Sequence, residues 1–116
     1  MTDAIDLTNR QCKPCEGGVP PLEPEAARQL LNALHAEWAI SEDGKWIRRE
    51  FTFSGFNRTM SFVNALGWIA NTEGHHPDLE VGYSKCVVNY STHAIDGLSD
   101  NDFICAAKID RLVEGI

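Results

Sequence analysis

Residues 73–93 read EGHHPDLEVGYSKCVVNYSTH, and this stretch decides the fold. After a Gly and a Pro that interrupt any helix, residues 79–81 and 85–92 are rich in β-branched and aromatic side chains, which favour strands. In the second segment every other side chain, from Cys86 to Thr92, falls on one face. We therefore predict two strands that pair antiparallel as a hairpin.

The same stretch holds three of the four histidines of the chain, His75, His76 and His93. Because two of them precede the first strand and the third follows the second strand, antiparallel pairing returns all three to one end of the hairpin. Pro77 biases His76 towards an extended conformation at that end. The unperturbed pKa of histidine, about 6.5, lets it donate and accept protons near neutrality. We predict one acid/base site there, and interpret His35 as an ordinary structural residue.

The segments on either side supply three helices and another hairpin. Residues 56–72 carry apolar side chains three to four positions apart, the spacing of an amphipathic helix, and residues 24–35 repeat this spacing after a proline. Between them, residues 38–40 and 45–53 flank a Glu-Asp-Gly turn and predict an antiparallel hairpin. Downstream, Ser99-Asp100-Asn101-Asp102 has the pattern of a capping box, so a third helix begins there, with a structural role for the Asp102 carboxylate.

The predicted order is α-β-β-α-β-β-α, without the β-α-β alternation that a parallel sheet needs. We expect an α+β fold in which three helices pack on one face of a four-stranded antiparallel sheet. Its open edges and other face favour self-association. The length of 116 residues suits one domain, which we expect at residues 22–116. Residues 1–21 end in Gly-Gly-Val-Pro-Pro and are expected to form a partly ordered N-terminal arm.

The charge of the chain argues against one class of partner. A net charge of −7 and a pI near 4.9 oppose direct binding of nucleic acid, which depends on Lys and Arg at the phosphates. No stretch approaches the roughly 18 apolar residues of a membrane-crossing helix, and residues 1–6 lack the features of a signal peptide. We expect a cytoplasmic protein that binds neither nucleic acid directly nor membranes.

Four cysteines, Cys12, Cys15, Cys86 and Cys105, are expected to be free thiols in a reducing compartment. Cys12 and Cys15 form a C-x-x-C pair, which could hold half of a zinc site or act as a redox pair. No second ligand pair with zinc spacing follows, and the Gly/Pro-rich surroundings differ from the strand-to-helix setting of a redox pair. We interpret the pair as incidental.

Several motifs together resemble the pterin-4a-carbinolamine dehydratase family. They are, in order, Glu73-Gly74-His75-His76-Pro77-Asp78, Tyr83, Ser91-Thr92-His93 and Gly97-Leu98-Ser99-x-x-Asp102, and both Trp38 and Phe51-x-Phe53-x-x-Phe56-Asn57-Arg58 also fit. The resemblance covers about residues 22–113 and leaves the N-terminal arm outside it.

The resemblance implies dehydration of 4a-hydroxytetrahydropterin to quinonoid dihydropterin, which recycles the cofactor of aromatic amino-acid hydroxylases and needs no metal or cofactor. It implies that His75 and His93 transfer protons and that His76 binds and orients the pterin. By the same resemblance the other substrate-binding residues are Pro77, Ser91, Thr92, Asp102, which anchors the site from the helix start, and Trp38 near the pocket mouth.

One position departs from the family pattern: many members carry an acidic residue four positions before the first histidine, where this chain has Asn71. We expect altered tuning of His75 rather than loss of activity, with Glu73 a candidate to compensate. The resemblance also implies a homodimer or homotetramer. Two alternatives stay open. One is a non-catalytic protein-binding module, like relatives that help a transcription factor dimerise or assist Rubisco assembly; the other is a zinc site of three histidines and an acid.

Overall fold

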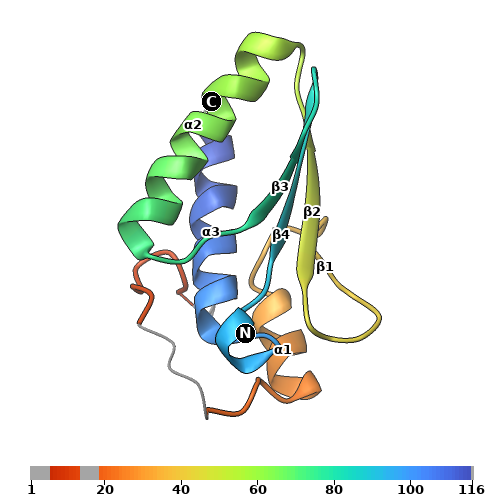
Figure 1. Ribbon diagram of the computed structural model, residues 1–116, viewed down its shortest axis with the longest axis vertical. Coiled ribbons are helices and arrows are strands. Elements are labelled where there is room, and N and C mark those ends of the chain that lie inside the picture. Colours follow the sequence, from red (N-terminus) through yellow and green to blue (C-terminus); the bar gives the residue numbers. More distant parts are fainter. Residues whose placement is uncertain (1–5, 14–18, 116) are drawn as a thin grey trace.

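The computed structural model describes residues 6–13 and 19–115 and has two layers, a sheet and the helices that cover one face of it (Figure 1). The predicted α+β class and element order are confirmed. In chain order the elements are α1 (Pro24–Leu31), β1 (Ala39–Ile40), β2 (Ile47–Thr52), α2 (Phe56–Glu73), β3 (Asp78–Val81), β4 (Lys85–Tyr90), the short 3₁₀ turn η1 (His93–Ile95) and α3 (Asp100–Glu114).

The sheet is antiparallel throughout, in the order β1-β2-β4-β3, so the histidine-bearing hairpin of β3 and β4 lies at one edge. Along β2 the side chains alternate strictly, with Ile47 and Phe51 buried and Arg48 and Glu50 exposed. Arg48 and Glu50 therefore point away from the helices, whereas Arg49 between them points towards α3, and an antiparallel sheet can present such a polar face to water.

Several element boundaries differ from the prediction, and hydrogen bonds explain two of the differences. The first helix ends at Leu31, because the N–H groups of Ala33 and Leu34 bond carbonyls only three residues back and tighten the chain into turns. Strand β4 ends at Tyr90, and Thr92 instead makes an isolated bridge to Gly97, whose carbonyl accepts the Thr92 N–H at 2.8 Å. The second difference bends the chain back and places His93 in η1.

The core lies between α2, α3 and the inner face of the sheet. Phe62 of α2 is fully buried, and its ring centroid lies 4.7 Å from that of Phe51 and 5.1 Å from that of Phe53. Aromatic pairs at such separations add to the free energy gained from burying their area. This packing fixes the direction of α2 and therefore the point at which its C-terminal end meets the sheet.

A buried ion pair ties α3 to the sheet. The Arg49 guanidinium on β2 donates to Oδ1 of Asp110 on α3 at 2.6 Å, and the Trp38 indole N–H donates to the same oxygen at 2.7 Å. The other carboxylate oxygen accepts the backbone N–H of His35 at 2.9 Å. Because a buried charge is tolerated when it is paired and hydrogen-bonded, Asp110 can lie in this interface.

The described part of the N-terminal arm packs against the domain beside the end of α2 and the start of α3 (Figure 1). Leu7 is 2% exposed and belongs to the main hydrophobic core. The Asn101 side chain accepts the Lys13 N–H at 3.1 Å and donates to the Lys13 carbonyl at 2.7 Å. Residues 6–13 are therefore held by both apolar burial and a two-sided hydrogen-bonded contact.

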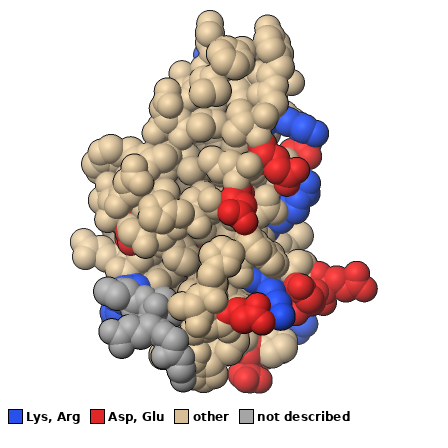
Figure 2. Space-filling view, in the orientation of Figure 1, with Lys and Arg blue, Asp and Glu red and all other residues tan. Residues whose placement is uncertain are grey.

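On the face drawn in Figure 2, Lys and Arg side chains are interspersed with Asp and Glu rather than gathered into a patch. That face offers no continuous basic surface to a phosphate backbone. Within residues 6–13 and 19–115, no helix combines the length and apolar character needed to cross a membrane.

Candidate active site

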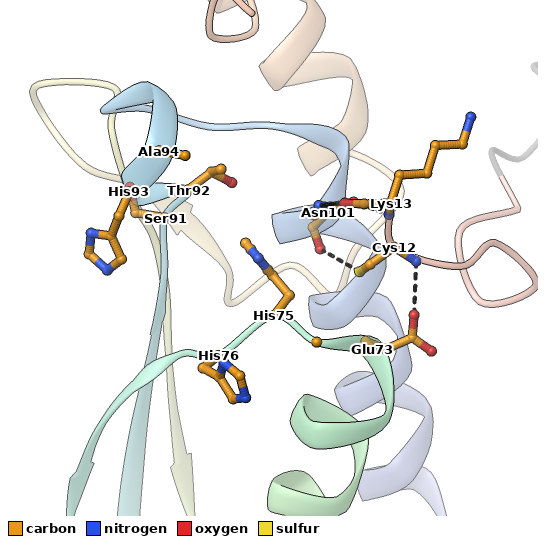
Figure 3. Close-up of a pocket in the computed structure, with 11 residues that line it drawn as sticks. Cys12, Lys13, Glu73, His75, His76, Ser91, Thr92, His93, Ala94 and Asn101 are labelled. Atoms are coloured by element: carbon orange, nitrogen blue, oxygen red, sulfur yellow. Dashed lines mark hydrogen bonds between the residues drawn. The ribbon is translucent and has the colours of Figure 1, made fainter. Parts of the chain in front are cut away.

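A cavity of about 490 Å³ opens where the end of α2, the start of β3 and the first turn of α3 meet. His75, His76 and His93 all line it, and in Figure 3 His75 lies between His93 and the Cys12 side of the cavity. A cavity of this volume suits a small ligand. The remaining lining residues are Cys12, Lys13, Glu73, Gly74, Ser91, Thr92, Ala94 and Asn101.

The end of α2 sets the position of the first histidine. Gly74 follows the helix in the left-handed conformation, with φ of 67°, which a residue without Cβ adopts at little cost. The His75 N–H still donates to the Ala70 carbonyl at 3.2 Å, so His75 stays attached to the last turn. The chain then leaves the helix for β3, and the imidazole lies at the bend.

A buried carboxylate orients His75. Asp102 is 0% exposed, and its Oδ1 lies 2.6 Å from His75 Nε2. Its Oδ2 accepts the Thr92 hydroxyl at 2.8 Å and the backbone N–H of Ser99 at 3.0 Å, the second of which belongs to the capping box of α3. The predicted structural role of Asp102 is therefore accompanied by a contact to the site.

The contact with Asp102 changes the proton affinity of His75. Burial of the ring works to lower its pKa, but the hydrogen bond and negative charge of Asp102 outweigh burial, and the pKa of His75 is raised. The imidazole also stacks on the Tyr90 ring, with centroids 5.4 Å apart and planes within 9°. Since Nε2 is engaged by Asp102, Nδ1 is the ring nitrogen left for a ligand.

The other two histidines are more open. His76 is exposed and lies just before β3, and His93 is exposed at the start of η1. The His93 ring meets Trp46 edge to face, with centroids 5.6 Å apart. Trp46 therefore restrains the orientation of His93, a contact that the sequence pattern did not predict.

Several expected binding residues lie behind the cavity or away from it. Asp102 has no exposed surface and reaches the cavity only through His75, so it is a positioning residue rather than a lining residue. Trp38 is 3% exposed, bonds Asp110 and lines a different hollow, since β1 is at the opposite edge of the sheet from β3. Pro77 is half-buried and does not line the cavity.

Ser91 and Thr92 do line the cavity, but their hydroxyl groups have internal partners. The Ser91 hydroxyl donates to the Lys45 carbonyl at 2.6 Å. The Thr92 hydroxyl lies 2.7 Å from the Ser99 hydroxyl in addition to its bond to Asp102. Both residues therefore hold the chain between β4 and α3 in place beneath the histidines.

This chain has Asn71 at the position where an acidic residue was expected, and Glu73 does not compensate by pairing with His75. Its carboxylate accepts the Cys12 N–H at 2.8 Å and the Lys108 ammonium at 2.9 Å. Burial opposes ionisation of Glu73, yet these two donors keep its pKa below the usual value. Glu73 thus connects α2 to the arm and to α3, and the nearest carboxylate contact of His75 is with Asp102.

The cavity wall includes arm residues that the sequence reading left outside the domain. Cys12 and Lys13 are brought there by Asn101 and Glu73. The second member of the C-x-x-C pair, Cys15, lies outside the described residues. Among residues 6–13 and 19–115, no group of three His, Cys, Asp or Glu side chains has the spacing of a metal site.

Comparison with known proteins gives one consistent result. The family model described as pterin 4 alpha carbinolamine dehydratase matches residues 20–112. A protein of Nitrosomonas europaea, provisionally named a pterin-4-alpha-carbinolamine dehydratase, is 56% identical over 112 residues, or 97% of each chain. A protein of Legionella pneumophila with the same provisional name is 53% identical over 108 residues, covering 93% of this chain and 96% of the relative.

Solved structures agree with the sequence relatives. The crystal structure of a transcriptional coactivator/pterin dehydratase from Brucella melitensis matches with a TM-score of 0.75 and 25% identity, over 79% of this chain and 97% of the other. A pterin dehydratase-like protein identified as a RuBisCO assembly factor in the alpha-carboxysome matches with a TM-score of 0.59 and 20% identity, over 67% and 90%. The second likeness concerns the fold alone.

Proposed function

Because the chain belongs to the pterin 4 alpha carbinolamine dehydratase family, we propose that it dehydrates 4a-hydroxytetrahydropterin to quinonoid dihydropterin and so recycles the cofactor of aromatic amino-acid hydroxylases. The observation that carries the proposal is the convergence of three imidazoles on one cavity of about 490 Å³. Loss of water from the substrate needs one proton delivered to the 4a-hydroxyl and one removed from N5, with no change of oxidation state. Histidines suit both tasks near neutral pH.

His75 is the acid of this proposed reaction. Its contact with Asp102 favours the imidazolium and leaves Nδ1–H free to donate to the departing hydroxyl. The carbon–oxygen bond then breaks, water leaves, and the N5 proton passes to His93. His76, exposed at the rim, binds and orients the pterin. One positioned acid or base typically contributes about 10² to 10⁴-fold to a rate.

Stopped-flow dehydration of synthetic 4a-hydroxytetrahydropterin tests the proposal, with rates recorded from about pH 5 to pH 9, the range in which histidines titrate. His75→Ala and His93→Ala should each lower the rate constant by about 10²-fold or more. His35→Ala is the matched control, because His35 is exposed and lies outside the cavity. Wild-type rates in both cavity variants would refute the acid/base assignment.

A protein-binding role is the second candidate. It is favoured by the name of the Brucella melitensis structure and by exposed aromatic side chains, among them Trp68 at 70% and Tyr83 at 73%. Exposed aromatic residues are enriched at protein interfaces. Purified protein that forms a stable complex but does not turn over the pterin would favour this role over catalysis.

The proposal also includes a cytoplasmic homodimer or homotetramer. The two open sheet edges, at β1 and β3, support self-association. Sedimentation equilibrium measures the oligomeric state directly, and a monomer at micromolar concentration would remove this part of the proposal without affecting the dehydratase assignment.

A further inference from the structure

Two thiols that are distant in sequence meet in the wall of the histidine cavity. Cys12 of the arm and Cys105 of α3 are separated by 93 positions, yet their sulfur atoms lie 3.4 Å apart. Cys105 has no exposed surface, whereas Cys12 is half-buried and lines the cavity. A small molecule in the cavity can therefore reach one sulfur of the pair directly.

The arm is fixed at the point where the thiols meet. Asn101 lies one helical turn before Cys105 and bonds both the N–H and the carbonyl of Lys13. On the other side of Cys12, Glu73 accepts its N–H at 2.8 Å. Figure 3 shows both contacts next to the Cys12 side chain. Because the backbone is held on both sides of the sulfur, the short distance is a built feature of the site.

The surroundings shift the pKa values of the two thiols in opposite directions. The S–H of Cys12 lowers its pKa most, burial opposes this, and the Tyr90 hydroxyl and the charge of His75 act in the same direction as Cys12, so the pKa of Cys105 is lowered. The pKa of Cys12 is raised by the same contact and by burial. A thiolate next to a partner thiol is the arrangement from which a disulfide forms.

We propose that Cys12 and Cys105 are an oxidation site that closes to a reversible disulfide and fastens the N-terminal arm to α3 beside the cavity. With hydrogen peroxide, the proton shared by the two sulfurs passes to Cys105 and the Cys12 thiolate attacks one peroxide oxygen. Cys12 becomes sulfenic acid as the O–O bond breaks, and the released hydroxide takes the Cys105 proton and leaves as water. The Cys105 thiolate then attacks that sulfur, the S–S bond forms as the S–O bond breaks, and the released hydroxide takes a proton from solvent and departs as a second water. Two thiols lose two electrons in total, and one peroxide gains them.

This site is independent of the proposed dehydratase activity, since it needs neither pterin nor any of the three histidines as a proton carrier. Its effect falls on the arm. A disulfide across 93 positions removes conformational freedom from the unfolded chain, and loops of that length give large stabilisation in the chain-entropy description. The oxidised protein should therefore unfold at a temperature at least about 5 °C higher than the reduced protein.

Peptide mapping tests the pairing directly. The full-length protein is treated with hydrogen peroxide, remaining thiols are alkylated, and the chain is digested without reductant. We expect one cross-linked peptide joining the segments of Cys12 and Cys105, which dithiothreitol separates. A disulfide between Cys12 and Cys15, or Cys12 oxidised to sulfinic acid without a cross-link, would overturn the proposal.

Three serine variants sharpen the test. Cys12→Ser should lose the cross-link and the rise in unfolding temperature, whereas Cys15→Ser should keep both. Cys86→Ser is the matched control for a buried thiol, since Cys86 lies in β4, opposite Phe51 and Val81 of the neighbouring strands, and it should keep both the cross-link and the temperature rise. If the temperature rise persisted in Cys12→Ser, the stabilisation would have another origin and the inference would fail.

Discussion

Replacing Asp102 by Asn should separate the orientation of His75 from the stability of α3. The substitution keeps the shape of the buried side chain. An amide oxygen can occupy the place of Oδ2 and still accept the Thr92 hydroxyl and the Ser99 N–H, at present 2.8 and 3.0 Å away. The amide nitrogen then occupies the place of Oδ1, 2.6 Å from His75 Nε2. That atom donates hydrogen bonds and accepts none.

The reversed hydrogen bond should remove the acid. An amide N–H can bond only an unprotonated Nε2, so neutral His75 is favoured over the imidazolium. Hydrogen bonds to charged groups contribute about 1.5 to 3 kcal/mol, and every 1.36 kcal/mol is tenfold in rate. Asp102 is 0% exposed, so solvent screens little of this interaction. We expect kcat for dehydration to fall about ten- to hundredfold, and the midpoint of its alkaline limb, where the acid loses its proton, to move to lower pH.

Asp110→Asn is the matched control, because it makes the same substitution at a buried carboxylate on the same helix. Asp110 bonds Arg49 and Trp38 rather than a histidine ring of the cavity. This variant should lose about 3 to 5 kcal/mol of unfolding free energy, the cost of breaking a buried ion pair, while its folded fraction keeps the wild-type kcat. If Asp102→Asn kept wild-type kcat and pH dependence, the role of Asp102 in orienting His75 would be refuted.

Three further predictions concern stability and the arm. The raised pKa of His75 stabilises the folded state fully below the unfolded pKa of about 6.5, and this stabilisation is lost as pH rises through the folded pKa. Urea unfolding of His75→Gln should therefore show a larger loss of unfolding free energy at acidic than at alkaline pH. An equal loss at both pH values would contradict the ion pair with Asp102. Asn101→Ala removes both bonds to Lys13 and should speed amide exchange in residues 6–13, whereas unchanged protection would show that Leu7 alone holds the arm. Phe62→Ala empties a fully buried site and should cost about 3 to 5 kcal/mol by thermal unfolding, and a loss below about 1 kcal/mol would mean that the aromatic cluster is not central to the core.

The fold and the meeting of the histidines could be predicted because both follow from local pattern. Period-2 alternation identifies β4, and antiparallel pairing with β3 then requires that His75, His76 and His93 return to one end. The position of Trp38 could not be predicted in this way. Its neighbour in space is Asp110, 72 positions away, and no periodicity connects the two residues.

The arm shows the same limit. Residues 6–13 contain one deeply buried apolar side chain, Leu7, and no repeating pattern that would predict a docked segment. Their contacts with Glu73 and Asn101 lie 61 and 88 positions away. Such contacts depend on where α2 ends and α3 begins, so they appear only once the helices are packed.

Asp102 explains why the fold and the candidate site cannot be described separately. One of its oxygens belongs to the capping box of α3 and to the Thr92 bond that holds the end of β4, while the other holds His75. Burying this carboxylate is costly unless its oxygens accept hydrogen bonds, and the partners of Asp102 come from three different segments of the chain. The packing of α3 against the β3–β4 hairpin therefore both satisfies the carboxylate and orients the imidazole. A His75 that is already fixed by folding loses little further freedom when a ligand enters the cavity, and that is the condition under which one imidazole can transfer a proton efficiently.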